Sequence, residues 1–369
     1  MILQADPGRS FFEIKEDIEK AVSRVLNSGW YILGNENRIF EEAFADYNEV
    51  PFCLGVANGM DAIEIILRAL GVGPGDLVAT VGNTAVATVS AVERTGAEVR
   101  FADIEDGKFT MSADSLKNLL EQEKNIKAVI AVHLFGAPAD MEKIIAVADR
   151  FQIPVIEDCA QAHGAVYQGH KCGTMGVAGS FSFYPTKNLG AFGDGGAVIT
   201  SDRALYEKMT ALRQYGWVKR YISEFSGINS RLDEIQAAIL SVKLPHLDEN
   251  NQRRRDIAAK YREGLSGISG LLLPEEPARG VHVYHQFVIR ITNGRRDELA
   301  AFLKSRNIGT AIHYPEPVPC QKAFLSVPRS VSLENTLAVN DEILSLPMYP
   351  ELSCSEVQEI IAAVRGFFA

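Results

Sequence analysis

The stretch "FSFYPTKNLGAFGDGG", residues 181–196, holds a single lysine, Lys187, between an aromatic, strand-forming run and a glycine-rich segment. Lysines that serve only as surface charges usually lie among other charged residues. Lys187 instead follows Phe183, Tyr184 and Pro185, and the next charged residue is Asp194. We therefore interpret Lys187 as a lysine whose amine takes part in chemistry.

A second candidate site is the segment "VANGMDAIEIILRAL", residues 56–70. Its apolar spacing predicts a helix that starts near Met60, preceded by a small Ala-Asn-Gly turn. Free backbone N–H groups and the positive end of the helix dipole form an anion site, and Gly59 allows a phosphate to approach the backbone. Taken alone, the same turn could be only a helix cap.

Acidic residues end another predicted strand, in "PVIEDCAQAHG", residues 154–164. Ligands of open parallel sheets bind beyond the carboxyl ends of the strands, so Glu157 and Asp158 are placed to reach one. Asp158 could hold a proton on a heteroaromatic nitrogen, or it could cap the following helix. We interpret His163 as a packed histidine rather than a catalytic base.

Together these features match the needs of a pyridoxal phosphate enzyme. The lysine forms a Schiff base with the cofactor, and the aspartate keeps the pyridine nitrogen protonated so that the ring accepts electrons. The start of the helix, with Ser182, holds the phosphate. The sequence thus predicts pyridoxal 5'-phosphate as the cofactor, with Lys187 as the catalytic residue.

Strands and helices alternate through the first two thirds of the chain, which predicts a mostly parallel sheet covered by helices. The predicted strands are residues 76–81, 98–104, 127–136, 153–160, 179–185 and 195–200. Ser112 is the predicted N-cap of one of the helices between them. Near Leu247 the pattern changes to charged helices mixed with a strand. We expect a large cofactor domain over residues 1–246 and a small C-terminal α/β domain over 247–369.

The composition narrows the class of protein. The chain has 369 residues, of which 47% are hydrophobic, and a formal net charge of −10. Such an acidic chain is not expected to bind nucleic acid, and no apolar run approaches the roughly 20 residues that span a bilayer. The five cysteines include no C-x-x-C pair, so neither a disulfide framework nor a metal site is predicted. Since the start of the chain lacks a secretory pattern, we expect a cytoplasmic enzyme.

Six segments of the chain occur in the same order as the blocks of a known family. They are "SGWYILGNENRIFEEAFADY", "NGMDAIEIIL", "EDCAQAHGA", "FSFYPTKNLGAFGDGGAVIT", "GINSRLDEIQAAIL" and "IHYPEPV". The chain resembles the sugar aminotransferases of the DegT/DnrJ/EryC1/StrS family, a branch of the fold-type I aspartate aminotransferase superfamily. The match runs nearly end to end. It implies the fold-type I architecture and a homodimer with shared active sites.

The resemblance also implies roles for individual residues. Lys187 carries the cofactor, Asp158 pairs with the pyridine nitrogen, and Gln161 lies near the ring and its O3' atom. The phosphate is bound by Gly59, Met60 and Ser182, and by Asn229 of the neighbouring subunit. Candidate contacts to the sugar or its diphosphate are Tyr184, Tyr215, Lys219, Tyr221, His313 and Tyr314.

By the same resemblance, the reaction moves an amino group from L-glutamate to a nucleotide-linked ketosugar. The segments "NTAVATVSAV" and "VYHQFVIR" are most similar to enzymes acting on dTDP-linked 3-keto-6-deoxyhexoses. Amination of a 4-keto sugar and a non-catalytic regulatory role are the alternatives. A lysine at position 187 excludes the dehydratase branch, which has a histidine there, and no G-x-G-x-x-G turn supports a dehydrogenase.

Two further features of the sequence concern this site. Where many family members have an aromatic residue that stacks on the cofactor ring, this chain has Ala85. Arg213 and Arg231 lie near amphipathic helices, where we expect them to serve packing or an ion pair between subunits.

Overall fold

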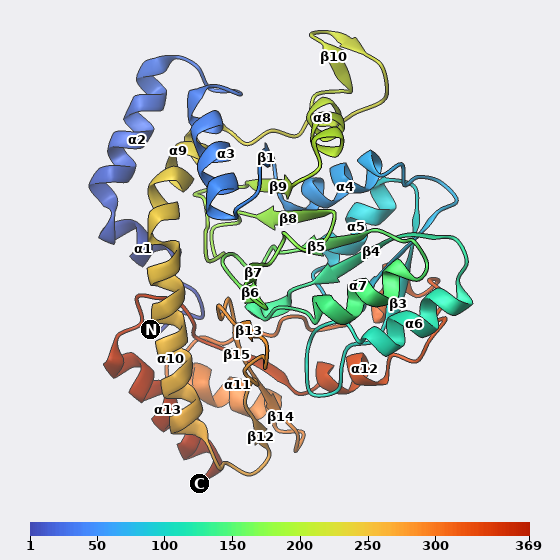
Figure 1. Cartoon of the computed structure of the whole chain (residues 1–369). Helices are drawn as coiled ribbons and strands as arrows, with labels where there is room; N and C mark the ends of the chain where they lie inside the picture. The colour runs from blue at the N-terminus through green and yellow to red at the C-terminus, as the bar shows by residue number, and fades with distance from the viewer.

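A seven-stranded sheet forms the centre of the larger lobe in the computed structural model, which describes residues 1–369 (Figure 1). The strand order is β1-β9-β8-β5-β4-β2-β3. Only β9 runs antiparallel to its neighbours β1 and β8, while the other neighbouring strands are parallel. The strands are β1 Phe52–Val56, β2 Leu77–Val81, β3 Glu98–Ala102, β4 Ile126–Val132, β5 Val155–Asp158, β8 Ala178–Ser182 and β9 Gly196–Thr200. The predicted mostly parallel sheet is confirmed.

The strands differ from their predicted ranges mainly at the carboxyl ends. β4 stops at Val132, because the chain turns into the short 3-10 helix η1, Leu134–Gly136, where Phe135 has a φ of 60°. β8 stops at Ser182, and β1 was not predicted at all. Both early endings fall at the edge of the sheet where polar side chains gather.

Helices cover both faces of this sheet (Figure 1). Helix α4 packs on β8 and β9, α3 packs on β1, and α6 and α7 pack along β3 to β5. Ser112 caps α6 as predicted, because its hydroxyl accepts the N–H of Ser115. The bounds are α3 Asn35–Tyr47, α4 Gly59–Ala69, α5 Val86–Arg94, α6 Ala113–Gln122, α7 Met141–Asp149, α8 Arg203–Leu212 and α9 Glu234–Lys243.

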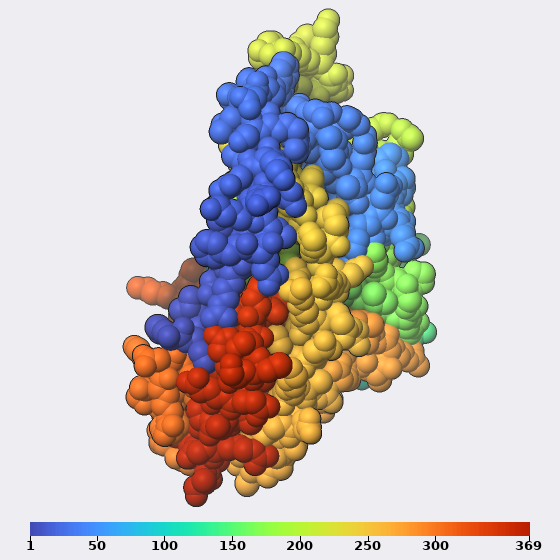
Figure 2. All heavy atoms as spheres, turned by 90° about the vertical axis from the view of Figure 1, so that its left-hand side faces the viewer, coloured from blue at the N-terminus to red at the C-terminus, as the bar shows by residue number.

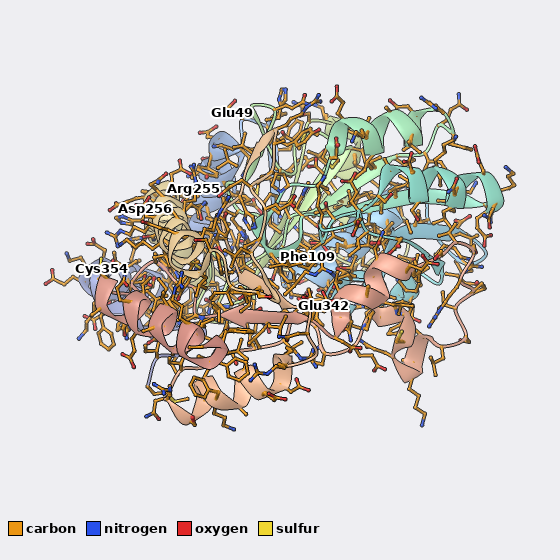
Figure 3. All side chains as sticks on the ribbon, turned by 90° about the horizontal axis from the view of Figure 1, so that it is seen from below. Glu49, Phe109, Arg255, Asp256, Glu342 and Cys354 are labelled. Atoms are coloured by element: carbon orange, nitrogen blue, oxygen red, sulfur yellow. The ribbon has the colours of Figure 1, made fainter.

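A second hydrophobic core lies around a small antiparallel sheet of β12 Leu271–Leu272, β14 Phe287–Ile291 and β15 Ile343–Leu346. Helices α10 Leu247–Leu265, α11 Arg296–Ser305 and α13 Cys354–Phe368 pack around it; Figure 3 shows this lobe from below, with Cys354 exposed at its margin. Ile2 belongs to this core although it lies at the other end of the chain. Conversely, α12 Glu334–Asn340 and the 3-10 helices η3 Val318–Cys320 and η4 Lys322–Phe324 pack on the core of the large sheet.

The first two helices run along the outside of both lobes. Helices α1 Pro7–Glu13 and α2 Lys15–Ser28 lie beside α9, α10 and α13 (Figure 2). An ion pair of 2.6 Å joins Arg9 to Glu356, and another of 3.1 Å joins Glu13 to Arg253. The N-terminal segment therefore connects the two cores.

Two smaller features complete the fold. β6 Val166–Tyr167, β7 His170–Lys171 and β13 Gly280–Val281 form a short sheet, and the 3-10 helix η2 Leu244–His246 joins α9 to α10. The hairpin of β10 Trp217–Lys219 and β11 Ile222–Ser223 projects from the body (Figure 1). None of the helices combines the length and apolar character that crossing a membrane requires.

Candidate active site

The start of α4 forms a cradle of free backbone N–H groups. Asn58 is the N-cap, and its side chain accepts the N–H of Asp61 at 2.8 Å. This bond leaves the N–H groups of Gly59 and Met60 at the open end of the helix. The helix begins at Gly59, one residue before the predicted start.

Ser182, at the end of β8, lies directly against this cradle. A Cβ atom placed on Gly59 would come within 2.7 Å of the Ser182 Cβ, a distance that real side chains do not tolerate. Glycine is thus required at position 59 by close packing. The structure brings together Gly59, Met60 and Ser182, the three phosphate ligands expected from this chain, and neutral donors at a helix start suit a phosphate.

Asp158 is the last residue of β5 and is 5% exposed. Its Oδ2 accepts the hydroxyl of Thr88 at 2.8 Å, and its Oδ1 accepts the N–H of Ala160 at 3.1 Å. Thr84 lies 2.9 Å from Thr88, hydroxyl to hydroxyl, so a short chain of polar groups fixes the carboxylate. Asp158 therefore has one defined orientation at the carboxyl edge of the sheet.

Lys187 lies in the turn that follows β8, and its backbone N–H bonds to the carbonyl of Tyr184 at 2.8 Å. Its side chain is half-buried and has no hydrogen-bond or ion-pair partner. Burial lowers the pKa of the amine to about 8, partly opposed by attraction to Asp158. An amine with this pKa is neutral, and so nucleophilic, in about a tenth of the molecules at pH 7 and in about half at pH 8, far more than for an ordinary lysine.

The side chain of Gln161 links the edge of the large sheet to the loop that contains Tyr314. Its Oε1 accepts the N–H of Phe135 at 2.7 Å, and its Nε2 donates to the hydroxyl of Tyr314 at 3.0 Å. Burial and nearby Asp158 raise the pKa of Tyr314 to about 12, against the Gln161 bond. His313 lies beside Tyr314 and bonds to the Ser345 hydroxyl at 2.8 Å.

The histidines around Lys187 are neutral. Burial, and then the charge of Lys187, lower the pKa of His163 to about 3 and that of His313 to about 4, and the same two causes lower the pKa of His285. His163 packs between Phe181 and Phe183, with ring centroids 5.5 and 5.8 Å away, as predicted for a packed histidine.

The remaining predicted residues do not converge on Lys187 within one chain. Tyr184 lies close to Lys187 in the sequence, but its side chain is 53% exposed. Tyr215, Lys219 and Tyr221 lie on or beside the projecting hairpin, where Trp217 contacts Tyr215 at a tilt and Tyr221 edge-on. Asn229 is exposed at the surface. These five side chains face solvent in the single chain.

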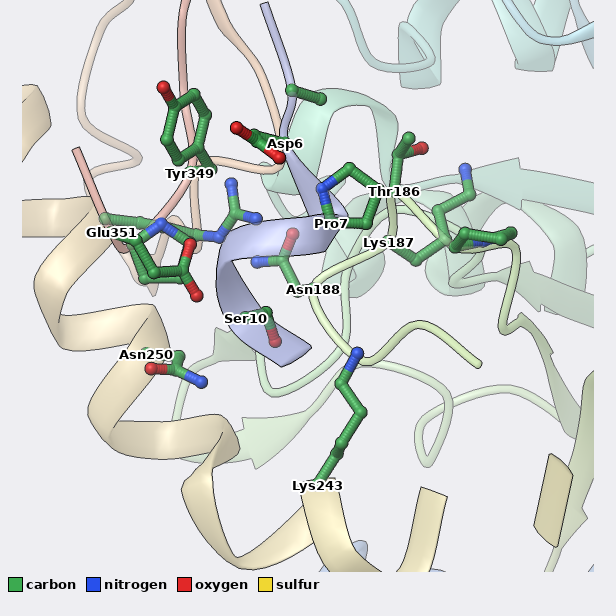
Figure 4. A pocket seen from close by; sticks show the side chains of 14 residues that line it. Asp6, Pro7, Ser10, Thr186, Lys187, Asn188, Lys243, Asn250, Tyr349 and Glu351 are labelled. Carbon is green, nitrogen blue, oxygen red and sulfur yellow. The ribbon is translucent and has the colours of Figure 1, made fainter. Parts of the chain in front are cut away.

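A polar cavity lies beside the Lys187 turn (Figure 4). Its wall includes Lys187 and Asn188 from the turn, Lys243 from the end of α9, and Arg254 and Glu351 from the other lobe. Lys243 bonds to the Gly190 carbonyl, and Arg254 bonds to the Met348 carbonyl at 2.9 Å. The cavity thus joins the turn to the small lobe through buried cations that hold backbone carbonyls.

Some residues of the site were not singled out from the sequence. Thr84 and Thr88 fix Asp158, and the signal that could have revealed them is their i, i+4 spacing at a helix start after a strand. Asn188 donates to Asn251 at 2.8 Å and lies 3.2 Å from His285, so the residue after Lys187 anchors the turn. No sequence pattern indicates that contact.

One buried group has the residue types of a metal site, namely His133, Glu157 and Cys159. Glu157 accepts backbone N–H groups from Gly173, Met175 and Gly176, each at 2.7 Å. Because His133 Nδ1 accepts the Ala139 N–H at 2.9 Å, its proton lies on Nε2 and is donated to Glu157. The group is already satisfied by protein hydrogen bonds.

Comparison with known proteins assigns the family. The model of the DegT/DnrJ/EryC1/StrS aminotransferase family matches residues 12–365. The chain belongs to this family, and its class is that of the sugar aminotransferases of fold-type I.

Individual relatives are similar over almost their whole length. The chain is 44% identical to the dTDP-3-amino-3,6-dideoxy-alpha-D-galactopyranose transaminase of Aneurinibacillus thermoaerophilus, over 96% of each chain. It is 42% identical to the dTDP-3-amino-3,4,6-trideoxy-alpha-D-glucose transaminase of Streptomyces venezuelae, over 98% of this chain and 94% of the relative. The crystal structure of S. venezuelae DesV with a ketimine intermediate superposes with a TM-score of 0.95 at 41% identity, covering 99% of this chain and 98% of DesV.

Proposed function

We propose that the protein transfers an amino group from L-glutamate to a nucleotide-linked keto-deoxysugar, with pyridoxal 5'-phosphate as the cofactor. The sugar is a dTDP-linked 3-keto-6-deoxyhexose, and the product serves amino-sugar biosynthesis. The observation that carries this proposal is the convergence of Lys187, Asp158 and the Gly59–Ser182 cradle at one edge of the sheet. Similarity to transaminases of dTDP-3-amino sugars supports the substrate class.

The residues of the site fit this cofactor. The cofactor supplies an aldehyde for the lysine and a ring that withdraws electrons from the reacting carbon. Gly59 and Met60 donate their N–H groups to its phosphate, Ser182 donates its hydroxyl, and Asp158 holds the proton of the ring nitrogen. Gln161, which is bonded to Phe135 and Tyr314, would donate its second amide hydrogen to the O3' oxygen.

Lys187 has two tasks in this proposal. Its neutral amine attaches the cofactor, since burial keeps the pKa near 8. Once the amino donor has displaced it, the same amine moves a proton between the substrate carbon and the cofactor carbon. The low pKa values of His163 and His313 make these histidines weaker bases than Lys187.

The proposal includes a homodimer in which each active site uses residues of both chains. The α2–α3 connection exposes large apolar residues: Trp30 is 65% exposed, Tyr31 49% and Ile32 41%. A cluster of this kind marks an interaction surface, and the occupant we propose is a second copy of this chain. Asn229 then reaches the partner's cofactor phosphate, and the hairpin with Tyr215, Lys219 and Tyr221 reaches the partner's sugar nucleotide. Tyr184, His313 and Tyr314 complete the sugar site from the same chain as Lys187.

The direct test is an assay of purified protein with pyridoxal phosphate, L-glutamate and a panel of dTDP- and UDP-linked 3-keto and 4-keto sugars. Mass spectrometry of the aminated product should show the highest rate with the dTDP-linked 3-keto sugar. A higher rate with a 4-keto sugar would assign the protein to that branch. Absence of any visible cofactor absorption would reject the proposal.

A mixing experiment tests the shared site. Lys187→Ala and Asn229→Asp should each be inactive, the second because a carboxylate repels the phosphate. In a mixed dimer, one of the two sites combines an intact lysine with an intact asparagine, so mixing should restore part of the activity. If mixed dimers form and remain inactive, Asn229 serves its own chain.

A further inference from the structure

Arg231 stands out among the cationic side chains of the protein. Every other arginine or lysine that is at least half-buried, apart from Lys187, has an ion-pair, hydrogen-bond or ring partner. Arg213, for example, bonds to Glu41 at 2.7 Å and to the Gly55 carbonyl at 2.8 Å. Arg231 has none of these contacts. The guanidinium of Arg231 is half-buried and has no partner in its own chain, so its N–H donors are free to bind a group outside the single chain.

The backbone around Arg231 fixes the direction of its side chain. Burial alternates through this extended segment: Ser230 and Leu232 are buried, whereas Asn229 is exposed and Arg231 half-exposed. The Ser230 hydroxyl accepts the Ala57 N–H at 3.0 Å, and the Leu232 carbonyl accepts the Asn37 amide at 2.8 Å. Successive side chains of an extended segment point to opposite sides, so Arg231 projects on the same side as Asn229.

The proposed phosphate cradle contains no cationic side chain. The groups proposed to hold the phosphate, at Gly59, Met60 and Ser182, are all neutral, while Asp61 and Asp158 add negative charge nearby. Arg94 pairs with Asp61 at 3.2 Å and is thereby engaged. A phosphoryl dianion in this cradle would have no arginine from its own chain. Arginine is the side chain best suited to bind two phosphoryl oxygens at once.

We infer that Arg231 binds a phosphoryl group in the active site of the partner subunit, on the same side of the segment as Asn229. The inference rests on the proposed function, because it needs both the homodimer and a phosphorylated ligand. Two ligands carry such a group: the cofactor, as a phosphate monoester, and the sugar nucleotide, as a diphosphate. Arg231 is thus assigned to ligand binding, and not to the packing or the ion pair between subunits that the sequence led us to expect.

The test compares Arg231→Gln, Arg231→Lys and the matched control Lys208→Gln, which removes an exposed, unpartnered charge on α8. Pyridoxal phosphate affinity is measured by visible absorption, dTDP affinity by calorimetry, and dimer dissociation by sedimentation. For a lost charge-assisted contact we expect Arg231→Gln to weaken one ligand about 10- to 100-fold. Arg231→Lys should weaken it less, and Lys208→Gln should change nothing.

The outcomes separate the possibilities. Weaker pyridoxal phosphate binding supports the inference and assigns the cofactor, whereas weaker dTDP binding alone supports it and assigns the nucleotide. If both affinities are unchanged, the inference is overturned; easier dimer dissociation would then identify an ion pair between subunits.

Inorganic phosphate gives a measurement that does not depend on the loaded enzyme. It should protect the apo wild-type dimer against thermal unfolding, and protect Arg231→Gln less; equal protection of both counts against Arg231. Failure of the wild type to bind pyridoxal phosphate would reject the proposed function, while the phosphate comparison would still test Arg231.

Discussion

The carboxyl edge of the large sheet and the projecting hairpin hold the two halves of the predicted site, and they are built in opposite ways. At the sheet edge, Asp158, Ser182 and the start of α4 are fixed by parallel strands and by direct hydrogen bonds. On the hairpin, Lys219 is exposed and Tyr221 is 73% exposed, and Tyr221 is supported by edge-on contact with Trp217 and by Arg220 over its ring.

This difference separates the chemistry from recognition. Groups that hold and move a proton must be positioned to within a fraction of an ångström, which a buried sheet edge provides. Groups that recognise a flexible sugar nucleotide need less exact placement and can come from an exposed hairpin. We therefore expect changes at the sheet edge to alter kcat and changes at the hairpin to alter KM.

The largest effect should follow from Lys187→Met. Without the amine, transamination should fall by at least ~10⁴-fold, because both attachment of the cofactor and proton transfer are lost. Steady-state turnover measures this, and borohydride reduction of the wild type should fix the cofactor on the peptide containing Lys187. A covalent label on Lys171 or Lys219 would reject the assignment.

The same variant should be more stable than the wild-type apo protein at pH 7, by about 1–3 kcal/mol. Folding lowers the pKa of Lys187 from 10.5 to about 8, so burial of the charged amine reduces the free energy of unfolding. This loss of stability is fully present below pH 8 and disappears as the pH approaches 10.5. Urea unfolding at pH 7 and pH 10 should show the gain shrinking. A gain independent of pH would show that packing, not charge, caused it.

Asp158→Asn should lower kcat by about 10²- to 10³-fold, because a neutral amide no longer holds the proton on the ring nitrogen. The variant should fold, since the amide oxygen can still accept the Ala160 N–H and the amide nitrogen can donate to the Thr88 hydroxyl. Rapid-mixing measurement of each half-reaction gives the effect. A rate close to wild type would remove Asp158 from the mechanism.

Tyr221→Ala on the hairpin should raise KM for the sugar nucleotide by roughly tenfold and leave kcat within a factor of a few. Its side chain is largely exposed, so the melting temperature should not change. Circular dichroism during heating serves as the control. A fall in kcat with constant KM would place the hairpin in the chemical step and contradict the comparison.

Cofactor uptake by the apoenzyme should depend on pH through Lys187. The amine reacts only when neutral, so the rate should rise about tenfold per pH unit up to pH 8 and level off above it. Stopped-flow visible absorbance follows the reaction. A rate that keeps rising to pH 10 would mean that the pKa of this amine is not lowered.

The smallest effect is expected for Thr88→Val, which removes the hydroxyl that bonds to Asp158 while keeping the side-chain shape. We expect a loss of about three- to tenfold in kcat, the size of one ordinary hydrogen bond, because this bond positions Asp158 and does not touch the reacting atoms. Thr84→Val is the matched control, because Thr84 contacts Thr88 but not Asp158. This substitution should lower kcat less than Thr88→Val does. Equal losses for both would indicate a packing effect.

Much of the molecule was predictable from the sequence. Six of the seven strands of the sheet follow from short apolar runs, because a parallel strand buried on both faces leaves a continuous hydrophobic signature. Lys187, Asp158 and Gly59 were predicted because in combination they match the needs of a pyridoxal phosphate site, although the Gly59 turn and Asp158 could each serve only as a cap when taken alone. The strand Phe52–Val56 was missed, and the 127–136 strand was extended too far, because local propensity does not show where a sheet edge begins.

Only the tertiary structure placed residues that are distant in the chain next to one another. Thr88 reaches Asp158 across 70 positions and Gln161 reaches Tyr314 across 153, and no local pattern encodes such pairs. The unpaired state of Arg231 likewise depends on where every acidic group of the fold lies. Residue type and spacing thus determined the chemistry available to this protein, whereas packing of the sheet edge decided which side chains hold Lys187 and Asp158 in place.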